Sequence, residues 1–79
     1  MIEGLDLVVL RRGVDAHGLK EGDVGAVVYR YAGGEAYEVE FVTGQGRTVA
    51  VVTLEEKDVR SLGESEILHA REVASTATA

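Results

Sequence analysis

The fold is decided by residues 19–54, which read LKEGDVGAVVYRYAGGEAYEVEFVTGQGRTVAVVTL. This stretch holds three runs of strand-forming residues, and glycine-containing turns join each run to the next. Gly33 and Gly34 in the first turn accept the positive φ angles that tight hairpins require. Consecutive short strands with turns of this kind are typical of a small antiparallel sheet that curls into a barrel.

The clearest strand signal lies in residues 35–42, where apolar and acidic side chains alternate. Glu38 and Glu40 occupy the acidic positions. The apolar positions between and beside them are Tyr37, Val39 and Phe41. An alternation with a period of two predicts a half-buried strand with one face in the core and one face in water.

The next strand, residues 47–54, breaks this rule. Val49 and Val51 fall on one face, while the opposite face carries Ala50, Val52 and Leu54. A strand of a small free-standing antiparallel barrel is expected to have one polar face. Either the tail or another chain is therefore expected to cover the second apolar face. The resulting candidate interface consists of Val49, Val51, Glu38, Glu40, Ile67 and Leu68.

Shorter elements flank these strands. We expect a first strand at residues 7–10, a second at residues 24–31 with a bulge near Gly25, and a short closing strand at residues 58–60. The predicted fold class is all-β, a five-stranded SH3-like partly open barrel. Its predicted core consists of Val8, Leu10, Val24, Val27, Tyr29, Tyr37, Val39, Phe41, Val52 and Leu54.

The composition changes near the C-terminus. We assign residues 1–62 to the barrel domain and residues 63–79 to a C-terminal tail. Ser65 is suited to cap a helix, but apolar residues are sparse across residues 64–73, so the tail is either irregular or one short helix. The last residues, 74–79, are expected to be disordered.

The composition excludes several classes of protein. The chain has 79 residues and no cysteine, which removes disulfides, thiolate catalysis and cysteine zinc sites and favours a cytoplasmic location. It shows neither a signal peptide nor an apolar run of roughly 20 residues, so no membrane association is expected. Its 14 acidic residues outnumber its 8 lysines and arginines. Nucleic acid is therefore not the expected partner, and a basic protein is better matched.

No residue constellation predicts catalysis, a metal site or a cofactor. His17 and His69 lie far apart in the sequence and are interpreted as solvated side chains. Glu38 and Glu40 are interpreted as a solubilising face, with Arg30 or Arg47 as cross-strand partners. The less favoured interpretation is that these glutamates form an acidic strip to which a basic partner docks. We therefore expect a protein that is not an enzyme and that binds no cofactor.

Three parts of the chain, residues 21–28, 35–41 and 52–54, resemble a family of small bacterial proteins known as domain of unknown function 4926. The resemblance implies an SH3-like partly open barrel and no assigned activity. It also suggests an antitoxin-like or immunity-like role as one of a pair of small proteins. Small barrels that serve as accessory subunits of larger complexes are similar as well.

The functional hypothesis is a protein-binding module, either a homodimer or the small acidic partner of another protein. The alternative is RNA binding, because residues 22–27 are similar to the KOW motif of ribosomal and transcription proteins. That alternative requires a local basic patch, and the residues available for it are Arg11, Arg12 and Arg30.

Overall fold

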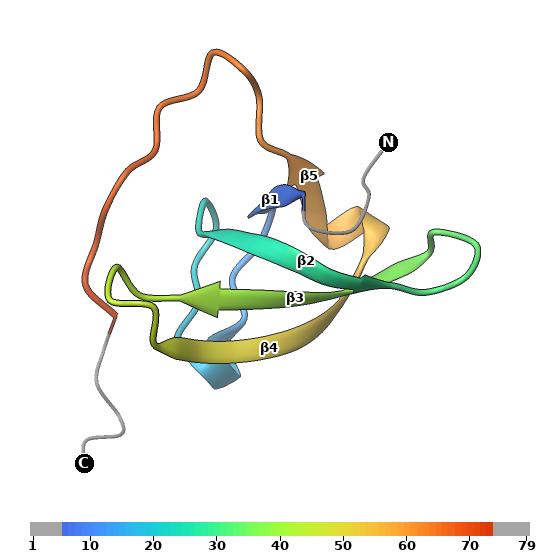
Figure 1. Cartoon of the computed structure of the whole chain (residues 1–79), viewed down its shortest axis with the longest axis horizontal. Coiled ribbons are helices and arrows are strands. Elements are labelled where there is room, and N and C mark those ends of the chain that lie inside the picture. Colours follow the sequence, from blue (N-terminus) through green and yellow to red (C-terminus); the bar gives the residue numbers. More distant parts are fainter. Residues whose placement is uncertain (1–5, 74–79) are drawn as a thin grey trace.

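A computed structural model describes residues 6–73 of the protein, which form one antiparallel sheet of five strands (Figure 1). The strands run in the order β4-β3-β2-β1-β5, so β4 and β5 are the two edges and the barrel is not closed. The elements are β1 (Leu7–Leu10), η1 (Asp15–His17), β2 (Val24–Arg30), β3 (Ala36–Val42), β4 (Thr48–Glu55), η2 (Glu56–Asp58) and β5 (Val59–Ser61). The prediction of an all-β, five-stranded, partly open fold is confirmed, and the sheet is compatible with an SH3-like description.

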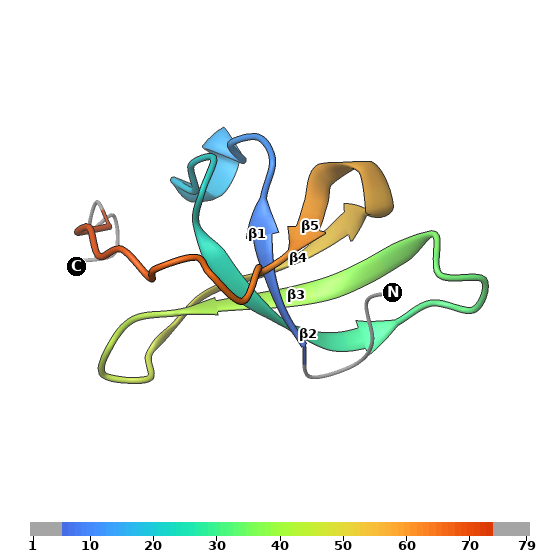
Figure 2. The same ribbon diagram turned by 90° about the horizontal axis from the view of Figure 1, so that it is seen from above.

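The core lies where the curled sheet folds over itself. Figure 2 shows β1 crossing β3, and the side chains between the two halves of the sheet are shielded from water. The buried cluster consists of Val8, Leu10, Leu19, Val27, Tyr37, Val39, Phe41, Leu54 and Val59. Val24 and Val52 of the predicted core are only half-buried. Tyr29 is 56% exposed, so its assignment to the core was wrong.

A bulge in β2 explains the position of Tyr29. Val27 pairs with Val39, but Tyr29 pairs with Glu38, so Val28 is an extra residue on β2. Because an extra residue moves the following side chains to the opposite face, Tyr29 points outward. The bulge therefore lies three residues beyond the expected position near Gly25.

Gly25 is not part of a bulge; its lack of a side chain allows close packing of β3 side chains against β2. A Cβ atom on Gly25 would lie 2.6 Å from Val39 Cγ1 and 2.8 Å from Phe41 Cε2. Both distances are shorter than ordinary carbon contacts. The missing side chain of Gly25 is what allows Phe41 to pack against β2.

The loop between β1 and β2, residues 11–23, covers part of the open side of the barrel. Leu19 projects from this loop into the core and forms an isolated bridge with Val14. The loop is tied to η2 by Arg12, whose Nε atom donates to Asp58 Oδ1 at 2.8 Å. The other carboxylate oxygen of Asp58 accepts the backbone N–H of Glu55 at 3.0 Å and caps η2.

Asp58 is buried but fully paired. The hydrogen bond from Arg12 lowers the pKa of Asp58, and this effect outweighs burial, which acts in the opposite direction. The carboxylate therefore stays ionised in the folded protein. It stabilises the junction between the β1–β2 loop and the start of β5.

Residues 62–73 form no helix; they arc away from β5 and descend beside the barrel as an irregular strap, coloured orange to red in Figure 1. Glu66 is bound bidentately by Arg60 at 2.7 and 2.6 Å. It also accepts the backbone N–H of Gly63 at 2.6 Å. The helical alternative for the tail is therefore wrong over this range. The predicted disorder of residues 74–79 lies outside the described residues.

Candidate protein-binding face

The outer surface of β2, β3 and β4 carries a group of exposed tyrosine, threonine and valine side chains around two half-buried glutamates. We call it the tyrosine–glutamate face, and its members are Tyr29, Tyr31, Glu38, Glu40, Thr48, Val51 and Thr53. The alternation of β3 directs its glutamates outward. The pairing of β4 with β3 places Thr53 opposite Glu38 and Val51 opposite Glu40.

Among residues 6–73, the glutamates of this face accept side-chain hydrogen bonds only from hydroxyl groups. Tyr31 Oη donates to Glu38 Oε2 at 2.5 Å, and Thr53 Oγ1 donates to the same oxygen at 2.6 Å. Thr48 Oγ1 donates to Glu40 Oε2 at 2.6 Å. Within residues 6–73 neither glutamate forms an ion pair, and the predicted pairs with Arg30 and Arg47 are not formed.

These hydroxyl bonds favour the charge states that the two groups ordinarily have near neutral pH. Hydrogen bonds from Thr53 and then Tyr31 lower the pKa of Glu38. In return, the hydrogen bond to Glu38 raises the pKa of Tyr31. Both shifts widen the pH range over which Glu38 is an anion and Tyr31 a neutral phenol.

Exposed apolar surface surrounds the two carboxylates. Val51 is 51% exposed beside Glu40, and the rings of Tyr29 and Tyr31 meet edge to face with centroids 4.9 Å apart. Val28 and Val42 are also exposed and lie on the same three strands. A patch of aromatic and aliphatic groups around unpaired charge is typical of a surface that binds another molecule.

The structure brings together only part of the predicted interface. Glu38, Glu40 and Val51 share the tyrosine–glutamate face, but Val49 does not. Phe41 pairs with Ala50 and Val42 with Thr48, so Val49 is the extra residue of a second bulge and packs against the core. The pattern of strand-forming residues gives no sign of this bulge.

The tail does not cover the face with its apolar residues. Ile67 is 90% exposed and Leu68 is 63% exposed, so neither buries its side chain on the sheet. One of the two predicted ways to cover the apolar face of β4 is thereby removed within the described residues.

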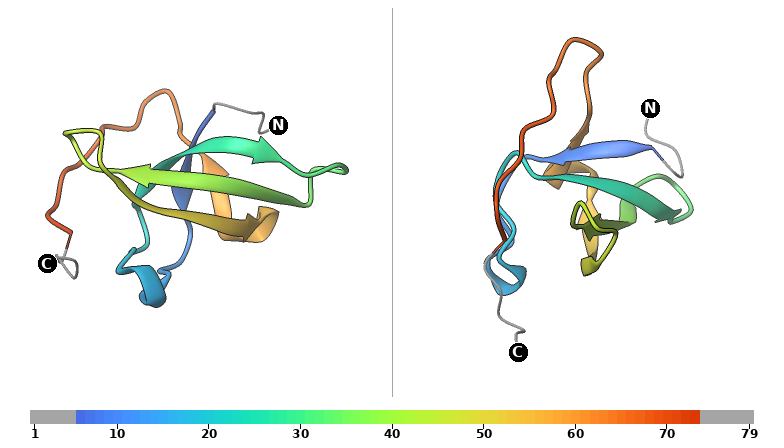
Figure 3. Two further views of the ribbon diagram at one scale, coloured as in Figure 1. Left: turned by 60° about the horizontal axis from the view of Figure 1, so that its bottom comes forward. Right: turned by 60° about the vertical axis from the view of Figure 1, so that its left-hand side comes forward.

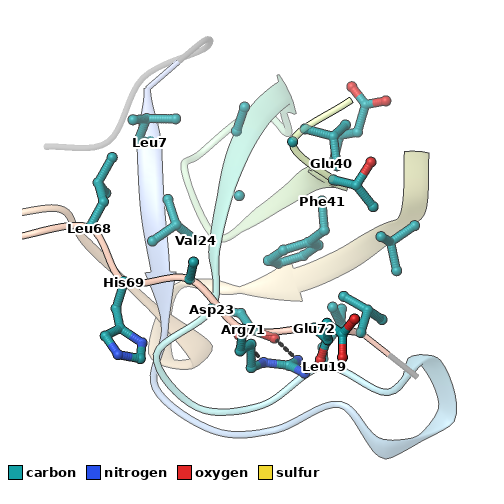
Figure 4. Close-up of a pocket in the computed structure, with 18 residues that line it drawn as sticks. Leu7, Leu19, Asp23, Val24, Glu40, Phe41, Leu68, His69, Arg71 and Glu72 are labelled. Carbon is teal, nitrogen blue, oxygen red and sulfur yellow. Dashed lines mark hydrogen bonds and ion pairs between the residues drawn. The ribbon is translucent and has the colours of Figure 1, made fainter. Parts of the chain in front are cut away.

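A groove of about 740 Å³ lies beside the face, between the tail and the barrel. Figure 4 shows Leu7, Val24 and Leu68 on one side of this tail groove and Glu40 and Phe41 on the other. Since Glu40 borders both the groove and the tyrosine–glutamate face, the two regions are continuous.

Arg71 fixes the tail at one end of the tail groove. Its Nε atom donates to Asp23 Oδ1 at 2.8 Å, and Nη2 donates to Asp23 Oδ2 and to the Gly18 carbonyl at 3.0 Å. Burial acts to raise the pKa of Asp23, but the bonds from Arg71 and from the Lys20 amide outweigh it and lower the pKa. Arg71 is thus a clamp between the tail and the β1–β2 loop.

The two histidines lie apart from each other in the structure. His17 lies exposed in η1, and His69 lies exposed in the tail at the groove. In the part of the chain that the structure describes, no group of three or more histidine, aspartate or glutamate side chains is arranged to hold a metal ion. No helix within that part is long and apolar enough to span a bilayer.

A family model described as Domain of unknown function (DUF4926) matches residues 5–61. The chain belongs to this family. The DUF4926 match ends at the last residue of β5, so the whole tyrosine–glutamate face lies within the family domain and the tail lies beyond it. No curated protein and no solved structure matches the chain.

Proposed function

We propose that this protein is a non-enzymatic binding module whose tyrosine–glutamate face binds a positively charged segment of a partner protein. One observation carries the proposal. Glu38 and Glu40 lie on an exposed, partly apolar face without a cation of their own among residues 6–73. A lysine or arginine from a partner supplies the missing charge, while the aliphatic stem of that side chain covers part of the apolar surface beside Val51.

The net charge favours a different protein over a second copy of this one. The chain carries a formal charge of −6, and two copies that met through this face would bring four glutamates together. Like charges across an interface destabilise it. The role that fits is that of a small acidic partner, whether antitoxin-like, immunity-like or an accessory subunit, in the cytoplasm.

The RNA-binding alternative finds less support in the geometry. Arg11 donates through Nε to the Val59 carbonyl at 3.1 Å, and Arg12 binds Asp58, so both stabilise the barrel. Tyr31 is held against Glu38, a carboxylate that repels phosphate. Binding to a protein partner is therefore the single function that we propose.

The proposal is tested with a blocked nine-residue peptide in which lysine and valine alternate. We expect saturable changes in the ¹H–¹⁵N spectrum that are confined to β2, β3 and β4. The double variant Glu38→Gln/Glu40→Gln is expected to weaken binding at least tenfold, because each lost charge removes a pairing partner. Binding is also expected to weaken as salt is added.

A matched variant controls for total charge. Glu21→Gln/Glu64→Gln removes two exposed carboxylates from a turn and from the tail, away from the face. It is expected to change the dissociation constant less than twofold. The proposal is overturned if the two double variants weaken binding equally. It is also overturned if the peptide shifts the resonances of all exposed acidic residues, because either result would mean nonspecific attraction.

A further inference from the structure

β4 is an edge strand whose outward backbone groups can be assigned from its pairing. Glu56 donates its N–H to the Glu35 carbonyl at 3.1 Å, which fixes the alternation of hydrogen-bonded pairs between β3 and β4. Ala50, Val52 and Leu54 therefore direct their backbone groups toward β3. Val51 and Thr53 direct theirs toward the open edge. Figure 3 shows β4 on the side of β3 away from β2.

This edge is in contact with water, and beyond the bulge at Val49 it lacks the usual protection. Among residues 6–73 no partner hydrogen-bonds to the backbone of Val51 or Thr53, and both residues are exposed. Residues 48–54 contain no charge and no proline. Edge strands are normally protected by shortness, lysine or proline, since an open edge pairs readily with other strands. The other edge, β5, is short and carries Arg60.

We propose that the positively charged segment binds as an extra antiparallel strand along β4. This inference rests on the proposed function and specifies how the partner binds. An added strand would lie about 5 Å from β4 and about 10 Å from β3. Its outward side chains would stand beside Val51 and Thr53, from where a lysine or arginine reaches toward Glu38 and Glu40.

The inner side of the added strand has a different neighbour. Val52 points to the core side of β4 and is only half-buried, so part of its surface remains to be covered. Alternate residues of the partner would face Val52 and are expected to be aliphatic. The inferred ligand is therefore an extended segment in which basic and aliphatic residues alternate, bound by strand addition.

Backbone methylation of the peptide tests this geometry while the protein stays unchanged. A lysine directly opposite Val51 is in a hydrogen-bonded pair, so its N–H points at β4, and the valine N–H groups point away. Methylation of the lysine backbone nitrogens is expected to weaken binding at least tenfold. Methylation of the valine nitrogens, with charge unchanged, is expected to weaken it less than threefold. In the complex, the amide of Val51 is expected to exchange with solvent at least tenfold more slowly.

The outcomes separate the two proposals. If both methylated peptides bind like the parent peptide while Glu38→Gln/Glu40→Gln weakens all three, the face binds a basic segment but strand addition is wrong. If the parent peptide does not bind, the proposed function itself fails. If sedimentation shows a dimer that the peptide does not dissociate and that Val51→Pro disrupts, the occupant of the edge is a second copy, which overturns the inference.

Discussion

The barrel, residues 6–61, and the tail, residues 62–73, are held in place by different forces. The barrel closes on a cluster of buried aliphatic and aromatic side chains. The tail leaves Ile67 and Leu68 in water and is attached through the Arg60–Glu66 and Arg71–Asp23 ion pairs. Burial of apolar area is insensitive to moderate salt, whereas exposed ion pairs are screened. The tail is therefore expected to detach under conditions that leave the barrel folded.

The largest expected difference between the regions comes from a pair of leucines. Leu54→Ala removes a side chain that is 2% exposed and is expected to lower the free energy of unfolding by about 3 kcal/mol. Leu68→Ala, at a side chain that is 63% exposed, is expected to change it by less than about 0.5 kcal/mol. Urea unfolding measures both values. Similar losses in the two variants would mean that the tail is part of the core.

A pair of glycines tests the packing of the barrel on a smaller scale. Gly25→Ala places a methyl group against Val39 and Phe41 and is expected to destabilise the fold by about 1–3 kcal/mol through overpacking. Gly44→Ala has no atom within 4 Å of the new Cβ and is expected to be nearly neutral. Thermal unfolding of the two variants makes the comparison, and a neutral Gly25→Ala would show that Phe41 does not pack against β2 as described.

Each region contains one aspartate–arginine ion pair, Asp58 with Arg12 in the barrel and Asp23 with Arg71 at the tail, and variants of the two pairs compare the regions. Asp58→Ala is expected to lower the free energy of unfolding by about 2 kcal/mol, because it removes a charged hydrogen bond and a cap. The folded pKa of Asp58 lies below its ordinary 3.8, so its contribution is present above that pH and is lost as the pH falls through the lowered value. Unfolding at several pH values measures this acid sensitivity, and Asp58→Ala is expected to lack it.

Arg71→Gln is the matching change in the tail. It is expected to leave the free energy of unfolding within about 0.5 kcal/mol of the wild type, since surface ion pairs contribute little. Amide exchange across residues 64–73 is expected to accelerate, and 1 M salt is expected to have the same effect on the wild type. Cooperative loss of barrel protection in this variant would contradict the separation of the two regions.

The smallest effect concerns the bend at the start of the tail. The hydrogen bonds from Arg60 lower the pKa of Glu66 from its ordinary 4.5 to about 2. Because the folded pKa is lowered, the stabilisation of the bend is complete above pH 4.5 and is lost as the pH falls through about 2. A carboxyl ¹³C titration measures the midpoint, which Arg60→Gln is expected to move back toward 4.5. An unchanged midpoint in Arg60→Gln would exclude the ion pair as the cause.

The sequence predicts β3 well and its neighbours less well, for a physical reason. β3 has no bulge of its own, so its alternation of glutamates with Tyr37, Val39 and Phe41 translates directly into two faces. β2 and β4 each contain an extra residue, Val28 and Val49, that moves the next side chains of the strand to the opposite face. Bulges depend on the register between strands, which a single strand's pattern does not encode.

The candidate face was predictable only in part for the same reason. Glu38, Glu40 and Val51 follow from alternation, but Tyr29 reaches the face only through the bulge at Val28. The hydroxyl partners of Glu38 depend on which residues of β4 lie opposite β3. The tail was the least predictable region, because a few long-range ion pairs decide its course and no local pattern marks them.

The most direct test determines whether the barrel or the tail binds the peptide. The dissociation constant of the alternating lysine–valine peptide, measured by fluorescence anisotropy, is compared in the wild type, in Arg71→Gln and in Glu38→Gln/Glu40→Gln. Binding by the barrel face predicts a constant within twofold of the wild type for Arg71→Gln and a loss of at least tenfold for the double glutamate variant. A large loss in Arg71→Gln together with unchanged binding in the glutamate variant would place the binding site in the tail and contradict the account.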